Sequence, residues 1–256
     1  MNAKNSKFNE IDKKKAFIDG KRPFPKHTAK RLNEKILVEW TYNTNAIEGN
    51  TLTLSETRVV LEGITVGGKT IKEHLEAINH RDAVIYLEDI VKGNENLSEW
   101  VIKNLHGIVL RDIDRENAGV YRKENVVISG ATHIPPDFLH VPWHMEKLIK
   151  WYYGEGQGMH PIERAAVLHT DFVKIHPFVD GNGRTARLLL NFELMKNGYP
   201  PAIIKKDIRP LYYEALDIAH TKGEYGLFTD IVVKALGDSL DLYIKVLGLR
   251  EKNMEL

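Results

Sequence analysis

The chain has 256 residues, of which 43% are hydrophobic and 28% charged, as in an ordinary soluble globular protein. Its formal net charge of +1 gives no broad attraction to nucleic acid or to a membrane surface, so neither is expected as a partner. The absence of cysteine excludes disulfides, a thiol nucleophile and a cysteine-based zinc site. The amino-terminal residues are polar, and no apolar run approaches the ~20 residues that span a bilayer. We therefore expect a cytoplasmic protein.

Apolar residues recur at helical spacing along most of the chain. Residues 1–30 are rich in lysine and predict an arm or a short helix. A helix is predicted over residues 31–48, because Gly49 suits the left-handed position that ends a helix. Thr53 and Glu56 have the spacing of a capping box, which opens a short helix ending near Gly63. Further helices are predicted over residues 73–92, 99–111, 142–153, 161–175, 184–197, 209–221 and 224–247.

Residues 119–135 interrupt the helical pattern. Val126, Val127 and Ile128 are β-branched, and a glycine and two prolines follow them. This pattern is typical of a β-hairpin. The predicted fold class is therefore all-α with one β-hairpin.

The sequence HPFVDGNGRTAR, residues 176–187, joins two predicted helices through a glycine-rich turn. Backbone N–H groups gather at the start of the second helix, where the helix dipole also favours an anion. Gly181 and Gly183 allow a phosphate to approach the backbone, and Asn182 adds amide donors. Arg184 and Arg187 lie three residues apart, so both can bind neighbouring phosphates. The segment predicts a polyphosphate site.

Two further residues of this segment supply chemistry. Asp180 is a hard oxygen ligand of the kind that holds Mg²⁺ on phosphates. His176, with an ordinary pKa near 6.5, can accept a proton at neutral pH. A Walker motif and the dinucleotide-binding fingerprint are both missing from the sequence. The combination favours attack of a hydroxyl on a nucleotide phosphorus.

The segment also resembles a known family. It matches the Fic signature at every fixed position: HPF, one variable residue, Asp or Glu, GNGR, two variable residues and Arg. The resemblance, which spans about residues 31–235, implies a helical bundle with a hairpin flap and transfer of AMP from ATP to a Ser, Thr or Tyr hydroxyl of a target protein. It implies that His176 is the general base, that Asp180 holds Mg²⁺ and that Arg187 binds the γ-phosphate. The remaining loop residues expected to contact the nucleotide are Gly181, Asn182, Gly183, Arg184, Thr185 and Ala186.

The resemblance extends to residues outside this loop. The hairpin resembles the flap that pins a target segment by main-chain pairing, which places four flap residues beside the nucleotide. Tyr212 and Tyr213 resemble the pair that lines the base and ribose pocket, although adjacent residues on a helix cannot face the same way. His220 stands where several relatives carry Asn. The expected flap contacts are Val126, Val127, Ile128 and Ser129.

TNAIEGN, residues 44–50, resembles the inhibitory helix of Fic proteins, with Ser or Thr, three variable residues, Glu, and Gly or Asn. A carboxylate in the last turn of a helix meets the negative end of the helix dipole, so Glu48 needs a cationic partner. The resemblance names that partner as Arg187. The alternative interpretation is an exposed glutamate that merely precedes a helix-ending glycine.

The predicted organisation is an amino-terminal arm or helix (1–30), an inhibitory helix with a helical extension (31–96), a Fic core (97–235) and a carboxy-terminal helix (236–256). The predicted activity is that of a self-inhibited protein adenylyltransferase that uses ATP and Mg²⁺, with self-modification and a homodimer as further expectations. Two alternatives stay open. The same site could remove AMP from a modified target, or the chain could be a catalytically silent ATP-binding interaction module. The sequence does not name the target.

Overall fold

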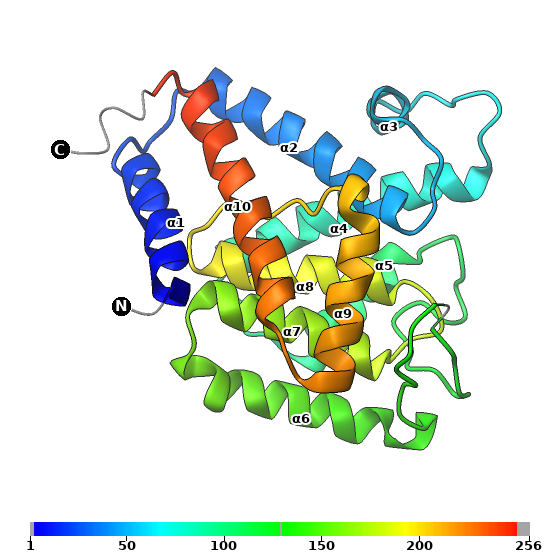
Figure 1. Ribbon diagram of the computed structural model, residues 1–256. Helices are drawn as coiled ribbons and strands as arrows, with labels where there is room; N and C mark the ends of the chain where they lie inside the picture. The colour runs from blue at the N-terminus through cyan, green and yellow to red at the C-terminus, as the bar shows by residue number, and fades with distance from the viewer. Residues whose placement is uncertain (1–2, 129, 250–256) are drawn as a thin grey trace.

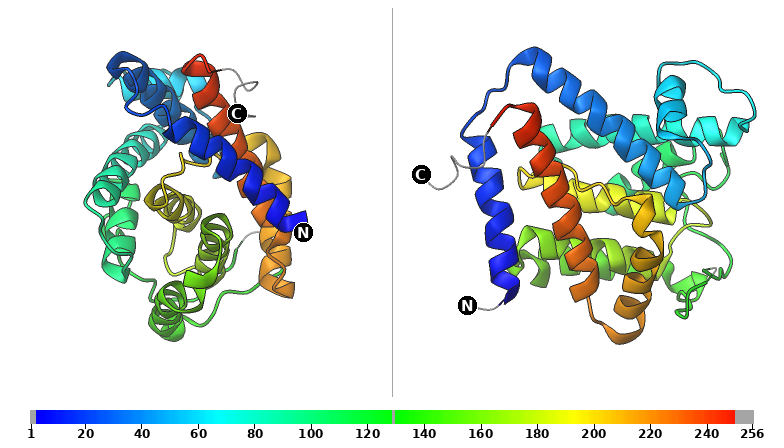
Figure 2. Two further views of the ribbon diagram at one scale, coloured as in Figure 1. Left: turned by 90° about the vertical axis from the view of Figure 1, so that its left-hand side faces the viewer. Right: turned by 45° about the horizontal axis from the view of Figure 1, so that its top comes forward.

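Two central helices carry the fold, and the others surround them (Figures 1 and 2). The structure is a computed structural model that describes residues 3–128 and 130–249, and within these residues it contains ten α-helices and three short 3₁₀-helices. The α-helices are α1 (Ala3–Asp19), α2 (Lys26–Ile47), α3 (Leu54–Leu61), α4 (Ile71–Lys92), α5 (Glu99–Val109), α6 (Val141–Tyr153), α7 (Pro161–Ile175), α8 (Asn182–Lys196), α9 (Arg209–Lys222) and α10 (Gly226–Val246). The 3₁₀-helices are η1 (Phe138–His140), η2 (Glu155–Gly158) and η3 (Lys206–Ile208).

Helices α7 and α8 form an antiparallel pair at the centre, joined by the loop of residues 176–181 (Figure 1). Helices α2, α4 and α5 pack on α8, whereas α6, α9 and α10 pack on α7. Helix α1 lies along α10, and α3 lies against α2 and α4. Leu188, Leu189, Leu190 and Phe192 of α8 are almost fully buried. Burial of such side chains contributes roughly 1.5–3 kcal/mol each, so the core fixes the helix that begins at the glycine-rich turn.

Local sequence explains where the helices nearest that turn begin and end. Thr53 accepts a hydrogen bond from the backbone N–H of Glu56, and the Glu56 side chain accepts one from Thr53 N, which is the predicted capping box. Helix α2 ends at Ile47, and Gly49 has the predicted left-handed backbone, with φ of +99°. The N–H groups of Gly49 and Asn50 donate to the carbonyls of Ala46 and Asn45, a Schellman motif. This motif fixes the backbone at Glu48, and with it the direction in which the chain leaves α2.

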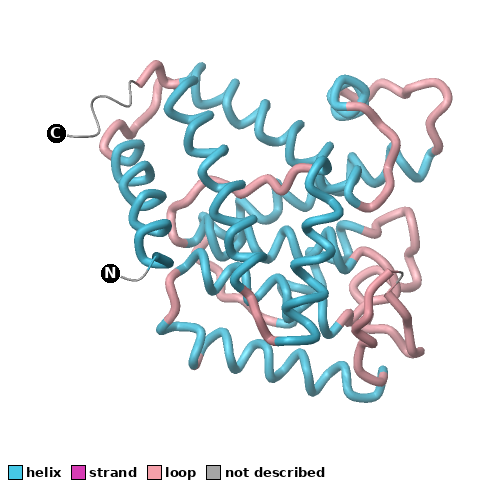
Figure 3. The backbone as a smooth tube through the Cα atoms, viewed as in Figure 1, coloured by secondary structure: helices cyan, strands magenta, loops and turns pink. Residues whose placement is uncertain are grey.

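The predicted β-hairpin over residues 119–135 is wrong. Residues 119–128 and 130–135 contain no strand, and Figure 3 draws this part of the chain as loop. Arg122 instead links two parts of the segment, because its guanidinium donates to the carbonyls of Glu124 and Pro136. A β-branched run gains stability as a strand only when a partner strand and a covered face are available, and Val127 is 83% exposed. The run therefore remains an extended loop.

No helix within residues 3–128 and 130–249 is both long enough and apolar enough to cross a bilayer.

Candidate active site

The loop between α7 and α8 reverses the chain within six residues. His176 ends α7 in the left-handed region, with φ of 50° and ψ of 60°, and Gly181 precedes α8 with φ of 76°. The Asn182 side chain accepts a hydrogen bond from Phe178 N (3.0 Å) and donates one to Phe178 O (2.8 Å). One of the two side-chain amide donors that we expected Asn182 to offer a phosphate is thus engaged in shaping the loop.

The buried side chain of His106 on α5 contacts the loop of residues 176–181. Its Nε2 lies 2.9 Å from the carbonyl oxygen of Asp180, and its Nδ1 accepts from Gly119 N at 2.9 Å. Because a carbonyl only accepts, Nε2 carries the proton, and burial lowers the pKa of His106 to about 4. The ring stacks on Phe178 with 3.5 Å between centroids. A Cβ at Gly181 would lie 3.2 Å from His106 Nε2, so this position favours glycine.

His176 is held as a neutral base. Its Nδ1 lies 3.3 Å from the carbonyl oxygen of Val173, so Nδ1 carries the proton and Nε2 keeps its lone pair. Burial, with a smaller contribution from nearby Arg122, lowers the pKa of His176 to about 4. The Arg122 guanidinium also donates to the carbonyl oxygen of His176 (2.9 Å), and its backbone N–H donates to Pro177 O (2.9 Å). The imidazole can therefore accept a proton at neutral pH.

Asp180 presents a half-exposed carboxylate at the mouth of the loop. Both of its oxygens lie 3.5 Å from Arg184 Nη2, and Lys72 Nζ lies 4.0 Å from Oδ2. Burial alone would raise the pKa of Asp180, but Arg184 and the Gly181 N–H outweigh it, so the pKa is lowered. The described residues contain no group of three or more His, Cys, Asp or Glu side chains that could hold a metal. A single carboxylate fits Mg²⁺ that takes its other ligands from phosphate and water, as this ion commonly does.

The first two turns of α8 place two arginines inside the protein. Gly181 has no side chain that could cap the helix, so the first N–H groups of α8 remain available to an external acceptor. Arg184 and Arg187 are only 2% and 3% exposed. Thr185 and Ala186 are fully buried, so the structure does not bring the side chains of these two expected contacts to the surface of the site.

Arg187 is fixed by contacts with two other helices. Its Nε donates to Thr44 Oγ1 (2.7 Å) and its Nη2 donates to Thr44 O (3.0 Å). Nη2 also lies 2.6 Å from Glu48 Oε1, while Nη1 donates to the Tyr212 hydroxyl at 3.1 Å. The Glu48 side chain is 32% exposed, whereas that of Arg187 is 3% exposed. The ion pair is therefore partly shielded from water, which strengthens it.

The Glu48 carboxylate lies directly over the glycine-rich turn. A Cβ built on Gly183 would meet Glu48 Oε1 at 2.2 Å and Arg187 Nη1 at 3.2 Å. Because Gly183 has no side chain, the Glu48 carboxylate can occupy this space. A negative group thus occupies the start of α8, where a helix amino terminus favours an anion.

Known proteins resemble this chain in sequence and in fold. The model of the Fic/DOC family matches residues 96–194. A fragment of Fic-1 from C. elegans superposes with a TM-score of 0.86 at 32% identity, covering 95% of this chain and 72% of the fragment. The chain belongs to the Fic/DOC family.

Two other Fic proteins are similar to most of this chain. A Fic domain containing signaling protein from Bacteroides thetaiotaomicron superposes with a TM-score of 0.84 at 29% identity, covering 95% of this chain and 99% of that one. Protein adenylyltransferase Fic from Drosophila ananassae is 37% identical over 217 residues, 84% of this chain and 43% of that protein. The chain spans less than half the length of this curated relative.

The two adjacent tyrosines of this Fic protein face different surroundings. Tyr212 is 1% exposed, and besides Arg187 its hydroxyl contacts His169 Nε2 at 3.1 Å. Tyr213 is 38% exposed, lies under Arg209 and reaches the Ile47 carbonyl at 3.3 Å. Only Tyr213 therefore offers a ring face to a ligand, as expected for neighbours on one helix.

Most of the expected flap contacts lie in the loop described above. Val126 and Ile128 are half-buried and Val127 is exposed, whereas Ser129 lies outside the described residues. His220 is buried, and its Nε2 contacts the Thr170 carbonyl at 2.9 Å. The structure thus leaves Val126 and Ile128 half-buried in this loop and does not expose His220.

Sequence reasoning missed the residues that support the site from other helices. His106, Arg122 and Thr44 position the loop and Arg187, and Glu76 of α4 lies 3.3 Å from Arg184. None of them lies in HPFVDGNGRTAR, and only Thr44 belongs to a recognised pattern. No local pattern in the sequence singles out His106 within the predicted helix 99–111.

Proposed function

We propose that this Fic protein is a self-inhibited protein adenylyltransferase that moves AMP from ATP to a Ser, Thr or Tyr hydroxyl of a target protein. The observation that carries the proposal is the neutral His176 beside a helix amino terminus with two buried arginines. The curated relatives named Protein adenylyltransferase Fic support the same reaction.

In this proposal, His176 Nε2 accepts the proton of the target hydroxyl as its oxygen attacks the α-phosphorus of ATP. The bond between the α-phosphorus and the bridging oxygen breaks, and pyrophosphate leaves. His176 then releases its proton to solvent. Gly181, Gly183 and Arg184 would cradle the phosphates, and Arg187 would bind the γ-phosphate.

Mg²⁺ would be held by Asp180. When bound, this ion supplies charge neutralisation of the pyrophosphate. The depressed pKa of Asp180 keeps its carboxylate ionised over the physiological range, as a Mg²⁺ ligand requires.

Glu48 would restrain the reaction. Its carboxylate engages Arg187 and lies over Gly183, so a γ-phosphate cannot reach the same guanidinium while the contact persists. Within this proposal, residues 31–96 carry the inhibitory helix and its extension, and residues 97–235 carry the catalytic core.

The test uses the Glu48→Gly variant with ATP labelled at either the α- or the γ-phosphorus, and follows label on the protein itself and on proteins of a cell lysate. AMP transfer predicts that only the α-label becomes attached. Label from the γ-phosphorus would indicate phosphoryl transfer instead. No label from either position would favour the silent ATP-binding module.

Removal of AMP is the second candidate, and one observation favours it. The Glu48 carboxylate is 32% exposed and lies at the phosphate position, where it could orient a water molecule. Incubating an AMP-modified target with the wild-type protein and with Glu48→Gln separates the two directions. Release of AMP by the wild type alone would establish the reverse reaction.

A further inference from the structure

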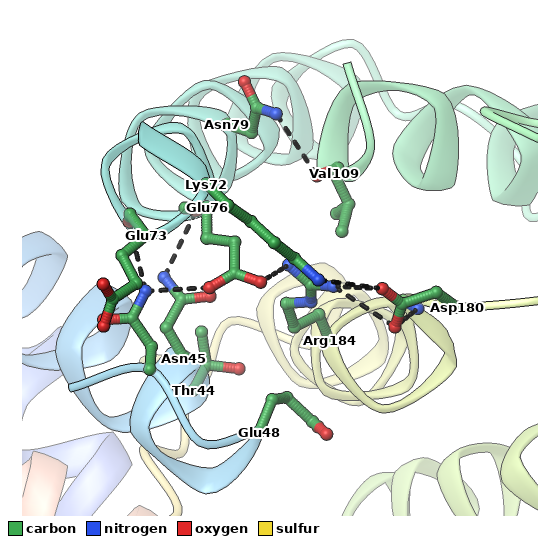
Figure 4. A network of polar contacts seen from close by, with 12 residues as sticks. Thr44, Asn45, Glu48, Lys72, Glu73, Glu76, Asn79, Val109, Asp180 and Arg184 are labelled. Atoms are coloured by element: carbon green, nitrogen blue, oxygen red, sulfur yellow. Dashed lines mark hydrogen bonds and ion pairs between the residues drawn. The ribbon is translucent and has the colours of Figure 1, made fainter. Parts of the chain in front are cut away.

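Arg184 receives a second carboxylate from a helix outside the catalytic loop. Its Nη1 lies 3.3 Å from Oε1 of Glu76 on α4, on the side away from Asp180 (Figure 4). Both side chains are shielded from water, at 2% exposure for Arg184 and 11% for Glu76. A buried guanidinium without a counter-charge is strongly destabilising, so Glu76 compensates the charge of Arg184.

The Glu76 carboxylate is itself held in one orientation. The Asn50 side chain donates to Glu76 Oε2 at 2.8 Å and to the Glu73 carbonyl at 3.1 Å. The Asn45 side chain donates to the Glu76 carbonyl at 3.2 Å. With Oε2 bound to Asn50, Oε1 is the oxygen that faces Arg184. Asn50 follows Glu48 by two residues, so the carboxylate connects the end of the inhibitory helix to the phosphate loop.

Only a carboxylate satisfies both neighbours. Asn50 Nδ2 donates a hydrogen bond and Arg184 carries a positive charge, and a carboxylate offers Asn50 an acceptor oxygen and Arg184 a counter-charge. A glutamine at position 76 has one acceptor oxygen and one NH₂ group, so it would direct a donor at one of the two partners. The expected consequence is displacement of the guanidinium rather than collapse of α4.

We propose that Glu76 is a positioning residue that sets Arg184 in the phosphate cradle and ties it to the segment following Glu48. The inference rests on the proposed function, because it assigns Arg184 to the phosphates of ATP. Glu76 would act through Arg184 and would not touch the nucleotide.

The experiment measures binding and turnover in the Glu48→Gly background. Binding uses a non-hydrolysable α,β-methylene analogue of ATP with Mg²⁺, and turnover gives kcat and KM for ATP. Glu76→Gln should raise the Kd of the analogue about tenfold, equivalent to ~1.4 kcal/mol, because the buried guanidinium loses its counter-charge and leaves its position. The matched control Asp89→Asn, an exposed acid on the same helix, should change neither value.

A double-mutant cycle separates positioning from a general structural effect. When Arg184→Met is already present, Glu76→Gln should weaken binding less than about twofold, because its route of action is gone. Equal weakening in both backgrounds, or an unchanged Kd in the presence of Arg184, would overturn the proposal.

If Glu76→Gln does not fold, Asn50→Ser replaces it. This variant keeps the carboxylate and loses the amide that orients it, so the Kd should rise in the same direction but by less. An unchanged Kd for Asn50→Ser would contradict the proposal. The binding cycle needs no transfer, so failure of Glu48→Gly to label any protein would count against the proposed function and not against Glu76.

Discussion

Glu48 Oε1 lies 2.6 Å from Arg187 Nη2, although 139 residues separate the two in the chain. The contact joins the end of α2 to the second turn of α8. Because Thr44 and Tyr212 hold the same guanidinium, we expect Arg187 to stay in place when Glu48 is removed. Loss of Glu48 should therefore free a preformed anion site.

Removal of the inhibitory carboxylate is the first prediction. Glu48→Gly and Glu48→Gln should each raise AMP transfer by ~10²-fold, the cost of misplacing a reactant by about 1 Å. Arg187→Ala should not gain activity, because it removes the γ-phosphate anchor together with the contact. Self-modification with α-labelled ATP measures all three, with Glu34→Gln of α2 as the control. Equal rates for wild type and Glu48→Gly would mean that Glu48 is only a helix end.

Loss of the general base is the second prediction. In the Glu48→Gly background, His176→Ala should lower transfer by ~10²–10⁴-fold while ATP still binds, because general-base catalysis is lost and the phosphate contacts remain. Transfer and nucleotide binding are measured separately. Near-normal transfer by this variant would show that His176 is not the base.

The pH dependence of transfer follows from the same residue. The pKa of His176 is lowered to about 4, so the imidazole stays neutral well below pH 6.5. For Glu48→Gly, kcat/KM should thus be level between about pH 5.5 and 7.5, where an unperturbed histidine would lose most of its basic form. A profile that falls with a midpoint near the ordinary histidine pKa would contradict the buried, neutral state of His176.

Addition of a methyl group at Gly183 gives a fourth prediction. A Cβ there would lie 2.2 Å from Glu48 Oε1, so Gly183→Ala should destabilise the protein by ~1–3 kcal/mol through overpacking. In the Glu48→Gly background that clash is absent, and alanine favours a helix over glycine by ~1 kcal/mol. Urea unfolding of the four proteins measures the coupling. The same loss in both backgrounds would show that Glu48 does not occupy this space.

Acid sensitivity of the fold is the fifth prediction. Burial lowers the pKa of His80 to about 3 and that of His106 to about 4, against 6.5 for the unfolded chain. The unfolded state binds more protons below 6.5, so the free energy of unfolding should fall as the pH drops from about 6.5 towards 4. The slope is on the order of 1 kcal/mol per pH unit for each histidine. His80→Asn should reduce this slope in urea unfolding, whereas His27→Asn, at an exposed position, should not.

The parts of the fold that depend on local sequence could be predicted. The helices, the Gly49 turn and the Thr53 cap follow from spacing and from backbone preferences that act within a few residues. The loop 176–187 was recognisable for the same reason. The β-branched run at 126–128 could not be interpreted locally, because a strand depends on a partner that only the tertiary structure supplies.

The residues that set the site from a distance lay beyond sequence reasoning for a related reason. Glu76 and His106 are single polar residues on amphipathic helices, and nothing nearby in the sequence distinguishes them from ordinary solvated or packed side chains. Their partners, Arg184 and the Asp180 carbonyl, come from more than 70 residues away. Only the packing of α4 and α5 on α8 brings them together.

In the proposed function the inhibitory carboxylate of Glu48 and the anion site belong to one chain, which has a kinetic consequence. A tethered inhibitor keeps the same local concentration however dilute the protein is, so dilution should not activate the enzyme. In the proposed function ATP competes with that carboxylate, so the apparent affinity for ATP is proportional to the fraction of molecules in which the contact is open. The basal rate of AMP transfer would then depend on how often the Glu48–Arg187 contact is open. A signal that shifts this equilibrium would change the rate of transfer at constant ATP concentration.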